Sequence, residues 1–307
     1  MWSIRLKNMS DEQLKRLATI AGVSLAVGLM LIKLFASLYT GSLAILSSLV
    51  DSISDIFASV IAFVAVRFSS LPASYQHRYG FGKAEALSAL VQSAFIAGSG
   101  LFVVYEGVNR FLNPASLVDM NLGIGVMIFS LILTIIVVAF QQYVAKKTKS
   151  LAVDADSVHY AVDIVTNISI ILSLFVVKFW GLEWFDPLAA VFVSAYLLYN
   201  AFKIAKEAVA LLMDRELPDE VRNKIVEIVE KHDFCRGLHD LRTRNLGGIY
   251  LFELHLELDG DLSLFEAHRL TEIIEDEIKE VYPKSQVIVH QDPAGFEEER
   301  LDNMLAD

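Results

Sequence analysis

Residues 43–66 read LAILSSLVDSISDIFASVIAFVAV, a stretch that is apolar except for its serines and two aspartates. About 20 such residues suffice for a helix that crosses a bilayer. Asp51 and Asp55 are four residues apart, so a helix places them one turn apart on one face, where like charges repel each other. Ionisable groups inside a membrane span cost about 2.5 to 3.5 kcal/mol each and are usually paired or functional. The two aspartates therefore call for a counter-charge.

The composition of the whole chain favours a membrane protein. Of its 307 residues, 54% are hydrophobic and only 21% are charged, which is more apolar than an ordinary soluble protein of this length. The formal net charge of −11 argues against nucleic acid as a partner. The single cysteine, Cys235, excludes an intramolecular disulfide and a thiolate cluster, so metal chemistry would have to use His, Asp and Glu.

Six apolar stretches are predicted to be transmembrane helices. Lysine and arginine gather before the first stretch and after the second and fourth, which places both termini in the cytoplasm by the positive-inside rule. The start, MWSIRLKNMSDEQLKRL, has no signal-peptide pattern, so we expect a cytoplasmic helix that runs into the membrane. The predicted spans are residues 17–39, 43–66, 86–108, 122–145, 156–179 and 187–206.

After residue 212 the composition changes to that of a small soluble domain. Pro218 and Asp219 open a predicted amphipathic helix over 218–232, and Gly247-Gly248 marks the turn of a β-hairpin. A second helix at 262–281 and a last strand, SQVIVHQD, complete the order α-β-β-α-β. The predicted fold is a membrane all-α domain of six helices, 1–212, followed by a small cytoplasmic α+β (αββαβ) domain, 213–295, and a disordered acidic tail, 296–307.

The fifth apolar stretch has the same pattern as the second, with two ionisable residues one helical turn apart. It contains DADSVHYAVDIVTN at 154–167, in which a histidine and an aspartate are again four apart. Two such helices side by side could present three carboxylates and one imidazole to a common point, as a tetrahedral cage for a divalent cation that removes the carboxylate repulsion. The alternative is that these residues cap or line helix ends near the interface, as we expect of Asp154 and Asp156. The predicted ligands are Asp51, Asp55, His159 and Asp163.

A second candidate metal site lies in the soluble domain. Four of the seven histidines fall between residues 239 and 290. In YLFELHLELDG the apolar residues alternate with a polar face that holds His255, and His290 and Asp292 share a face in VIVHQD. Four imidazoles and a carboxylate suit zinc, as one ion or as two bridged by Asp292; the alternative is a scatter of surface histidines. The predicted ligands are His239, His255, His268, His290 and Asp292.

Together these features resemble the cation diffusion facilitator family, and within it the bacterial ferrous-iron and zinc efflux branch. The resemblance rests on the six spans, D-x-x-x-D in the second, H-x-x-x-D in the fifth, and stretches such as HRYGFGKAEAL, LLMDRELPDE, HDLRTR and VHQDP, and it runs from about residue 12 to 295. It implies homodimers in the bacterial cytoplasmic (inner) membrane that exchange metal for protons, with the second site at the dimer interface. It also implies an ion-pair interlock of the membrane halves, which maps onto Lys83 and Asp214.

The loop after the second span departs from that branch. Members usually carry a third metal site there, D-x-x-H-x-x-x-H, whereas this chain reads SYQHRYGF, with Ser74, His77 and Phe81 at the three positions. Because two of three ligands are missing, we expect this third site to be absent or very weak. The loop would then keep at most an electrostatic or docking role.

The predicted function is proton-coupled efflux of divalent transition-metal cations, not enzymatic catalysis. Metal ligands bind deprotonated, so metal and protons compete for one site. Imidazole has a reference pKa of about 6.5, which makes His159 the expected proton-exchanging residue, with one carboxylate of the cluster as a second candidate. Zn²⁺ is favoured as cargo, with Fe²⁺, Cd²⁺, Mn²⁺ and Co²⁺ as alternatives, and metal on the cytoplasmic domain is expected to regulate transport. A non-transporting membrane metal sensor and an intramembrane aspartyl protease, which would have no use for His159, stay open.

Overall fold

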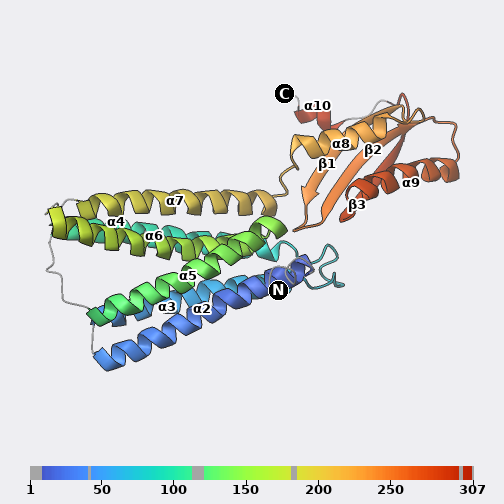
Figure 1. The fold of residues 1–307 in the computed structure, drawn as a ribbon. Coiled ribbons are helices and arrows are strands. Elements are labelled where there is room, and N and C mark those ends of the chain that lie inside the picture. Colours follow the sequence, from blue (N-terminus) through green and yellow to red (C-terminus); the bar gives the residue numbers. More distant parts are fainter. Residues whose placement is uncertain (1–8, 41–42, 113–120, 181–184, 297–299, 306–307) are drawn as a thin grey trace. The chain divides into compact units, whose positions relative to one another are not determined.

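The structure is a computed structural model that describes residues 9–40, 43–112, 121–180, 185–296 and 300–305; for some residues inside the helices it describes the backbone alone. The chain divides into two compact units. The first lies within Met1–Pro72 and Ala84–Val209, and the second combines Ala73–Lys83 with Ala210–Asp307. Figure 1 shows the elements in chain order.

Six long helices make up the first unit in the described residues, and each of the six predicted spans lies within one of them, so this part of the prediction is confirmed. Three helical stretches are by themselves long and apolar enough to cross a membrane, within the part of the chain that the structure describes: Asp11–Phe35, Ala84–Tyr105 and Ile128–Thr148. The helices are α2 (Asp11–Thr40), α3 (Leu43–Ser69), α4 (Ala84–Leu112), α5 (Asn121–Thr148), α6 (Leu151–Trp180) and α7 (Phe185–Leu212).

Polar caps make the helices longer than the predicted spans. Before α2, the Gln13 N–H donates to Ser10 Oγ at 3.3 Å and the Ser10 N–H donates to Gln13 Oε1 at 3.1 Å, a reciprocal cap that starts the helix outside the apolar stretch. Before α6, Ser150 Oγ accepts the Val153 N–H at 3.3 Å. Hydropathy alone does not report such helix starts.

Small residues bring the helices of the first unit close together. Helix α2 packs against α3 and α5, and α6 packs against α3, α4 and α5. Buried alanines such as Ala26 and Ala62 allow this close approach. Gly22 in α2 is the tightest point, because a Cβ there would lie 2.6 Å from Asp156 Oδ2 and 2.8 Å from Gln141 Nε2.

The second unit contains a three-stranded sheet in the order β1-β2-β3, with β1 antiparallel and β3 parallel to β2. The predicted α-β-β-α-β order is confirmed, and a short helix follows it. The elements are α8 (Asp219–Glu230), β1 (Gly237–Asn245), β2 (Tyr250–Leu258), α9 (Leu264–Val281), β3 (Ser285–Pro293) and α10 (Leu301–Leu305).

One face of this sheet carries the hydrophobic core of the second unit. Phe252, Leu254 and Leu256 alternate along β2 and are buried, and α8 and α9 pack Ile225 and Ile274 into the same cluster. Side chains alternate between the faces of a strand, so the intervening residues of β2 lie on the face opposite these helices. The polar candidate ligands of the sheet occupy that opposite face.

The loop at Ala73–Lys83 belongs to the second unit. Gly82 lies against the β1–β2 hairpin turn, where a Cβ on Gly247 would come within 2.1 Å of the Gly82 carbonyl carbon. Gly247 and Gly248 have φ values of +87° and +100°, which glycine adopts without strain. Asn245 Oδ1 accepts both of their N–H groups, at 2.9 and 2.8 Å. The loop is therefore in direct backbone contact with the hairpin.

Part of the C-terminal segment is structured. The sequence predicts disorder for 296–307, whereas Leu301–Leu305 form α10, which contacts β1. The carboxylate of Asp240 in β1 accepts the N–H groups of Leu301 and Asp302, both at 3.0 Å. Burial acts to raise the pKa of Asp240, but these two backbone donors, together with the nearby His239 and His255, lower it below its usual value. The Asp240 carboxylate on β1 therefore accepts hydrogen bonds from the first backbone N–H groups of α10.

Candidate metal sites

The transmembrane candidate site lies between α3 and α6. One ligand atom from each of Asp55, His159 and Asp163 lies within 4.8 Å of the other two, and His159 Nε2 is 3.2 Å from Asp55 Oδ1. Asp55 and His159 are buried. Asp51 lies one turn before Asp55 in α3, and its side chain lies outside the described residues. Three of the four predicted ligands are therefore brought together.

This donor set fits a divalent transition metal. Carboxylate and imidazole are ligands that Zn²⁺ and its neighbours accept, and a buried group of like-charged carboxylates is stabilised when a cation enters it. Because the donors come from two helices, a small relative movement of α3 and α6 would assemble or separate them. The residues present could hold a metal ion and also release it.

Asp156 supports this site and does not play the role that the sequence analysis gave it. It was expected to cap or line a helix end near the interface, but it is fully buried among four helices. Gln141 Nε2 in α5 donates to it at 2.6 Å and Ser59 Oγ in α3 donates at 2.9 Å. Ser59 Oγ is also 2.7 Å from the Tyr160 hydroxyl, which donates to the Gly22 carbonyl in α2 at 3.0 Å. The cluster fixes α6 one turn before His159.

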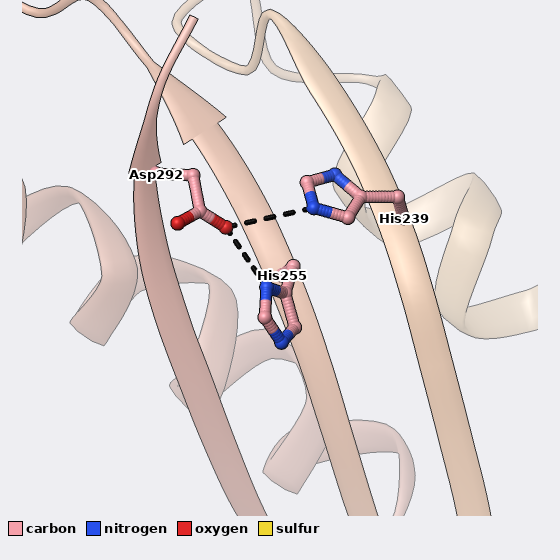
Figure 2. Close-up of side chains that lie close together, drawn as sticks. All are labelled: His239, His255 and Asp292. Carbon is pink, nitrogen blue, oxygen red and sulfur yellow. Dashed lines mark hydrogen bonds and ion pairs between the residues drawn. The ribbon is translucent and has the colours of Figure 1, made fainter. Parts of the chain in front are cut away.

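The cytoplasmic candidate site is built on three adjacent strands (Figure 2). His239 on β1 is directly opposite His255 on β2, and Asp292 on β3 is paired with the residue two positions after His255. His255 Nδ1 lies 2.9 Å from Asp292 Oδ2, and His239 Nε2 lies 3.6 Å from the same oxygen. One ligand atom from each of the three residues lies within 4.8 Å of the others. Strand register alone thus creates a three-ligand cluster.

The two remaining histidines predicted for this site are placed differently. His290 Nε2 lies 3.2 Å from Asp292 Oδ1, the carboxylate oxygen that His255 does not contact, and its side chain is 63% exposed. His268 is 65% exposed and lies 3.6 Å from Glu272 on its own helix. His290 therefore extends the cluster through Asp292, whereas His268 lies apart from it within one chain.

Glu257 is a site residue that the sequence analysis did not single out. It shares the polar face of β2 with His255, and its Oε1 lies 3.3 Å from His239 Nδ1, the ring nitrogen turned away from Asp292. A carboxylate is commonly found beside the ring nitrogen of a metal-binding histidine that does not face the metal. The sequence did offer a signal for this role, because Glu257 stands two residues after the predicted ligand His255.

The predicted interlock residues form an ion pair within the second unit. Lys83 Nζ lies 2.7 Å from Asp214 Oδ1, and Arg244 Nη1 lies 3.5 Å from the other oxygen of Asp214. Whether this pair holds two membrane halves together stays a prediction. In the preceding loop the His77 ring packs on Phe81 with ring centroids 4.5 Å apart, and the expected weakness of a third metal site there also stays a prediction.

Two family models and several relatives match this chain. Residues 19–213 match the family model described as the cation efflux transmembrane domain, and residues 217–294 match that of the cation efflux protein cytoplasmic domain. A cation-efflux pump FieF from Salmonella arizonae is 43% identical over 293 residues, which cover 94% of this chain and 96% of that protein, and a FieF from Shigella boydii serotype 18 matches to the same extent. The metal-bound C-terminal domain of the CzcD transporter from Thermotoga maritima, a solved structure, is 29% identical and covers 26% of this chain and 93% of its own, with a TM-score of 0.25.

Fold, site and matches define a multi-pass membrane protein that exports cations and carries a cytoplasmic domain. The chain belongs to the cation diffusion facilitator family. It is a transporter and not an enzyme, which removes both the non-transporting metal sensor and the aspartyl protease from the alternatives.

Proposed function

We propose that this transporter exports divalent transition-metal cations, Zn²⁺ foremost, across the bacterial inner membrane in exchange for protons. The transport site would consist of Asp51, Asp55, His159 and Asp163. The observation that carries the proposal is the approach of Asp55, His159 and Asp163 from two helices to within 4.8 Å, with two of the three buried. The relatives named cation-efflux pumps support the direction of transport.

The coupling to protons follows from the chemistry of these ligands. Each must be deprotonated to bind metal, so metal entry displaces protons and proton entry releases metal. His159 is the group whose ordinary pKa, about 6.5, lies nearest to neutral pH. A rocking of α6 against α3 would present the assembled site to the cytoplasm and the separated, protonated site to the outside.

The cytoplasmic domain would act as the regulatory site of a homodimer, with domain limits near 1–212 and 213–295. His239, His255 and Asp292 would bind one metal ion, and the second oxygen of Asp292 with His290 would offer a bridged second site. His268, exposed and apart from the cluster, suits a ligand donated across the interface to the partner subunit. Bound metal would favour one arrangement of the two copies through differential affinity.

Zn²⁺ flux in proteoliposomes tests the transport site. We expect Asp163→Asn, which keeps the shape of the side chain and removes its charge, to abolish Zn²⁺ flux driven by a pH gradient. Asp154→Asn on the same helix is the matched control, because its carboxylate lies outside the three-residue cluster. Full flux in Asp163→Asn would refute the assignment.

A metal panel separates the remaining alternatives. Fe²⁺, Cd²⁺, Mn²⁺ and Co²⁺ in the same assay identify the cargo. If the parent protein moves neither Zn²⁺ nor any of these ions, the proposed class of cargo is wrong. If flux does not respond to the pH gradient, the proposed exchange with protons is wrong although efflux stands.

A further inference from the structure

The C-terminal segment Arg300–Leu305 lies beyond residue 294, where the matched cytoplasmic family domain ends. We call it the C-terminal strap. It is attached at residue 240 by reciprocal hydrogen bonds: the Asp240 carboxylate accepts the N–H groups of Leu301 and Asp302 at 3.0 Å, and the Asp240 N–H donates to Asp302 Oδ2 at 2.7 Å. Asp240 and His239 are buried neighbours. The strap therefore holds the backbone immediately after a candidate metal ligand.

The backbone at this attachment point is unusual. Asp240 has a φ of +49°, a left-handed value that is strained for a non-glycine residue. The pairing register of β1 with β2 shifts between His239 and Arg242, as in a β-bulge, which redirects the side chains beside it. The three hydrogen bonds to the strap stabilise this conformation. The direction of the His239 side chain depends on it.

A second contact reaches the same histidine from its side chain. Arg300 Nη2 lies 2.5 Å from Glu257 Oε1, and that same oxygen lies 3.3 Å from His239 Nδ1. His239 Nε2 in turn faces Asp292 at 3.6 Å. The strap thus ends a continuous line of polar contacts that runs from Arg300 through Glu257 and His239 to Asp292.

We infer that the C-terminal strap is a positioning element of the cytoplasmic metal site, in which Arg300 fixes Glu257 and Asp302 fixes the backbone at Asp240, so that His239 is held ready to bind metal. This inference rests on the proposed cytoplasmic site. Metal affinity and strap docking are then coupled, and the coupling is reciprocal: the strap raises metal affinity by the same factor by which metal favours the docked strap.

Zn²⁺ titration calorimetry on the full-length protein in detergent tests the first half of this coupling. Partners that orient a metal ligand typically contribute about 10-fold or more to affinity, so we expect Arg300→Gln, and a chain that ends at residue 299, to weaken Zn²⁺ binding at the cytoplasmic site by roughly 10-fold. Arg300→Lys should recover part of the loss. Arg236→Gln, which removes an exposed ion pair with Asp259 in the same domain, should bind as the parent does.

A double-variant comparison distinguishes positioning from general destabilisation. If Arg300 acts through Glu257, adding Arg300→Gln to Glu257→Gln should cause little further loss of affinity. If the losses of Zn²⁺ affinity in the two single variants add up in the double variant, Arg300 does not act through Glu257 and the inference is refuted. An increase in affinity in Arg300→Gln would also overturn the inference, since it would mean that the guanidinium merely competes with the metal for Glu257.

Spin labelling tests the reciprocal half. A label on Met304→Cys, in a Cys235→Ser background, should become less mobile when Zn²⁺ is added, and it should not respond in His255→Ala. If His255→Ala binds Zn²⁺ like the parent, the proposed cytoplasmic site itself is wrong. A different outcome would leave the site standing but refute the inference. In it, His255→Ala loses Zn²⁺ binding, Arg300→Gln and the shortened chain bind Zn²⁺ as the parent does, and the label does not respond to Zn²⁺.

Discussion

Gly22→Ala forces a methyl group into the polar cluster around Asp156. Alanine normally stabilises a helix interior by about 1 kcal/mol relative to glycine. Here the new Cβ would lie 2.6 Å from Asp156 Oδ2, and an ordinary contact needs 3.4 Å, so the carboxylate must retreat by about 0.8 Å and strain its hydrogen bonds from Gln141 and Ser59. Such bonds contribute about 0.6 kcal/mol each between membrane helices and about 1.5–3 kcal/mol to charged groups in soluble proteins. With overpacking strain of about 1–3 kcal/mol, the net loss is about 1–3 kcal/mol.

Thermal unfolding in detergent measures this loss against a matched control. Gly28→Ala lies on the same helix with nothing within 4 Å of its added Cβ, so it should be neutral or stabilising. At about 2–4 °C per kcal/mol for a chain of this size, Gly22→Ala should melt several degrees below it. In an Asp156→Ala background the penalty should shrink, because the obstructing carboxylate is gone. Equal melting of the two glycine variants, or an undiminished penalty in that background, would contradict this reasoning.

Two further predictions concern the second unit. Gly247→Ala combines left-handed strain at φ +87° with a clash against Gly82, so we expect it to lower the free energy of unfolding by about 1–3 kcal/mol and more than Gly248→Ala, whose Cβ meets open space; equal effects in chemical denaturation would contradict the loop contact. Hydrogen bonds from Ser263 lower the pKa of Glu266 below its usual 4.5 in the cap of α9, so this stabilisation is present above that value and is lost as pH falls through the lower folded pKa. Ser263→Ala should cost about 1 kcal/mol at pH 7 and less in acid, as circular dichroism at several pH values can measure.

Local patterns were enough for most of the fold because the relevant signals are periodic. Apolar length predicted each membrane helix, and the alternation in YLFELHLELDG predicted which face of β2 would be buried. The same alternation placed His255 on the polar face, and the strand register then brought His239 opposite to it. Pairs spaced four apart predicted which helix faces would carry Asp55 and Asp163.

The remainder depends on partners that are distant in sequence. Asp156 resembles a helix-end aspartate until Gln141 and Ser59, from two other helices, are seen to donate to it. Arg300 stands in a short acidic segment with no periodicity, and its contact with Glu257 arises only when that segment folds back on the sheet. Neither residue has a local signature that differs from that of an ordinary solvated charge.

The contact between Gly82 and Gly247 has a consequence for building chimeras of related transporters. Because Ala73–Lys83 is part of the second unit, the second unit is not one continuous stretch of sequence. A single cut in the sequence near residue 210 therefore does not separate the two units. A hybrid that exchanges everything after residue 210 would pack the Ala73–Lys83 loop of one parent against the β1–β2 hairpin of the other. The contact between Gly82 and Gly247 leaves no room there for an added methyl group. Faithful recombination of these modules would have to transfer both stretches together.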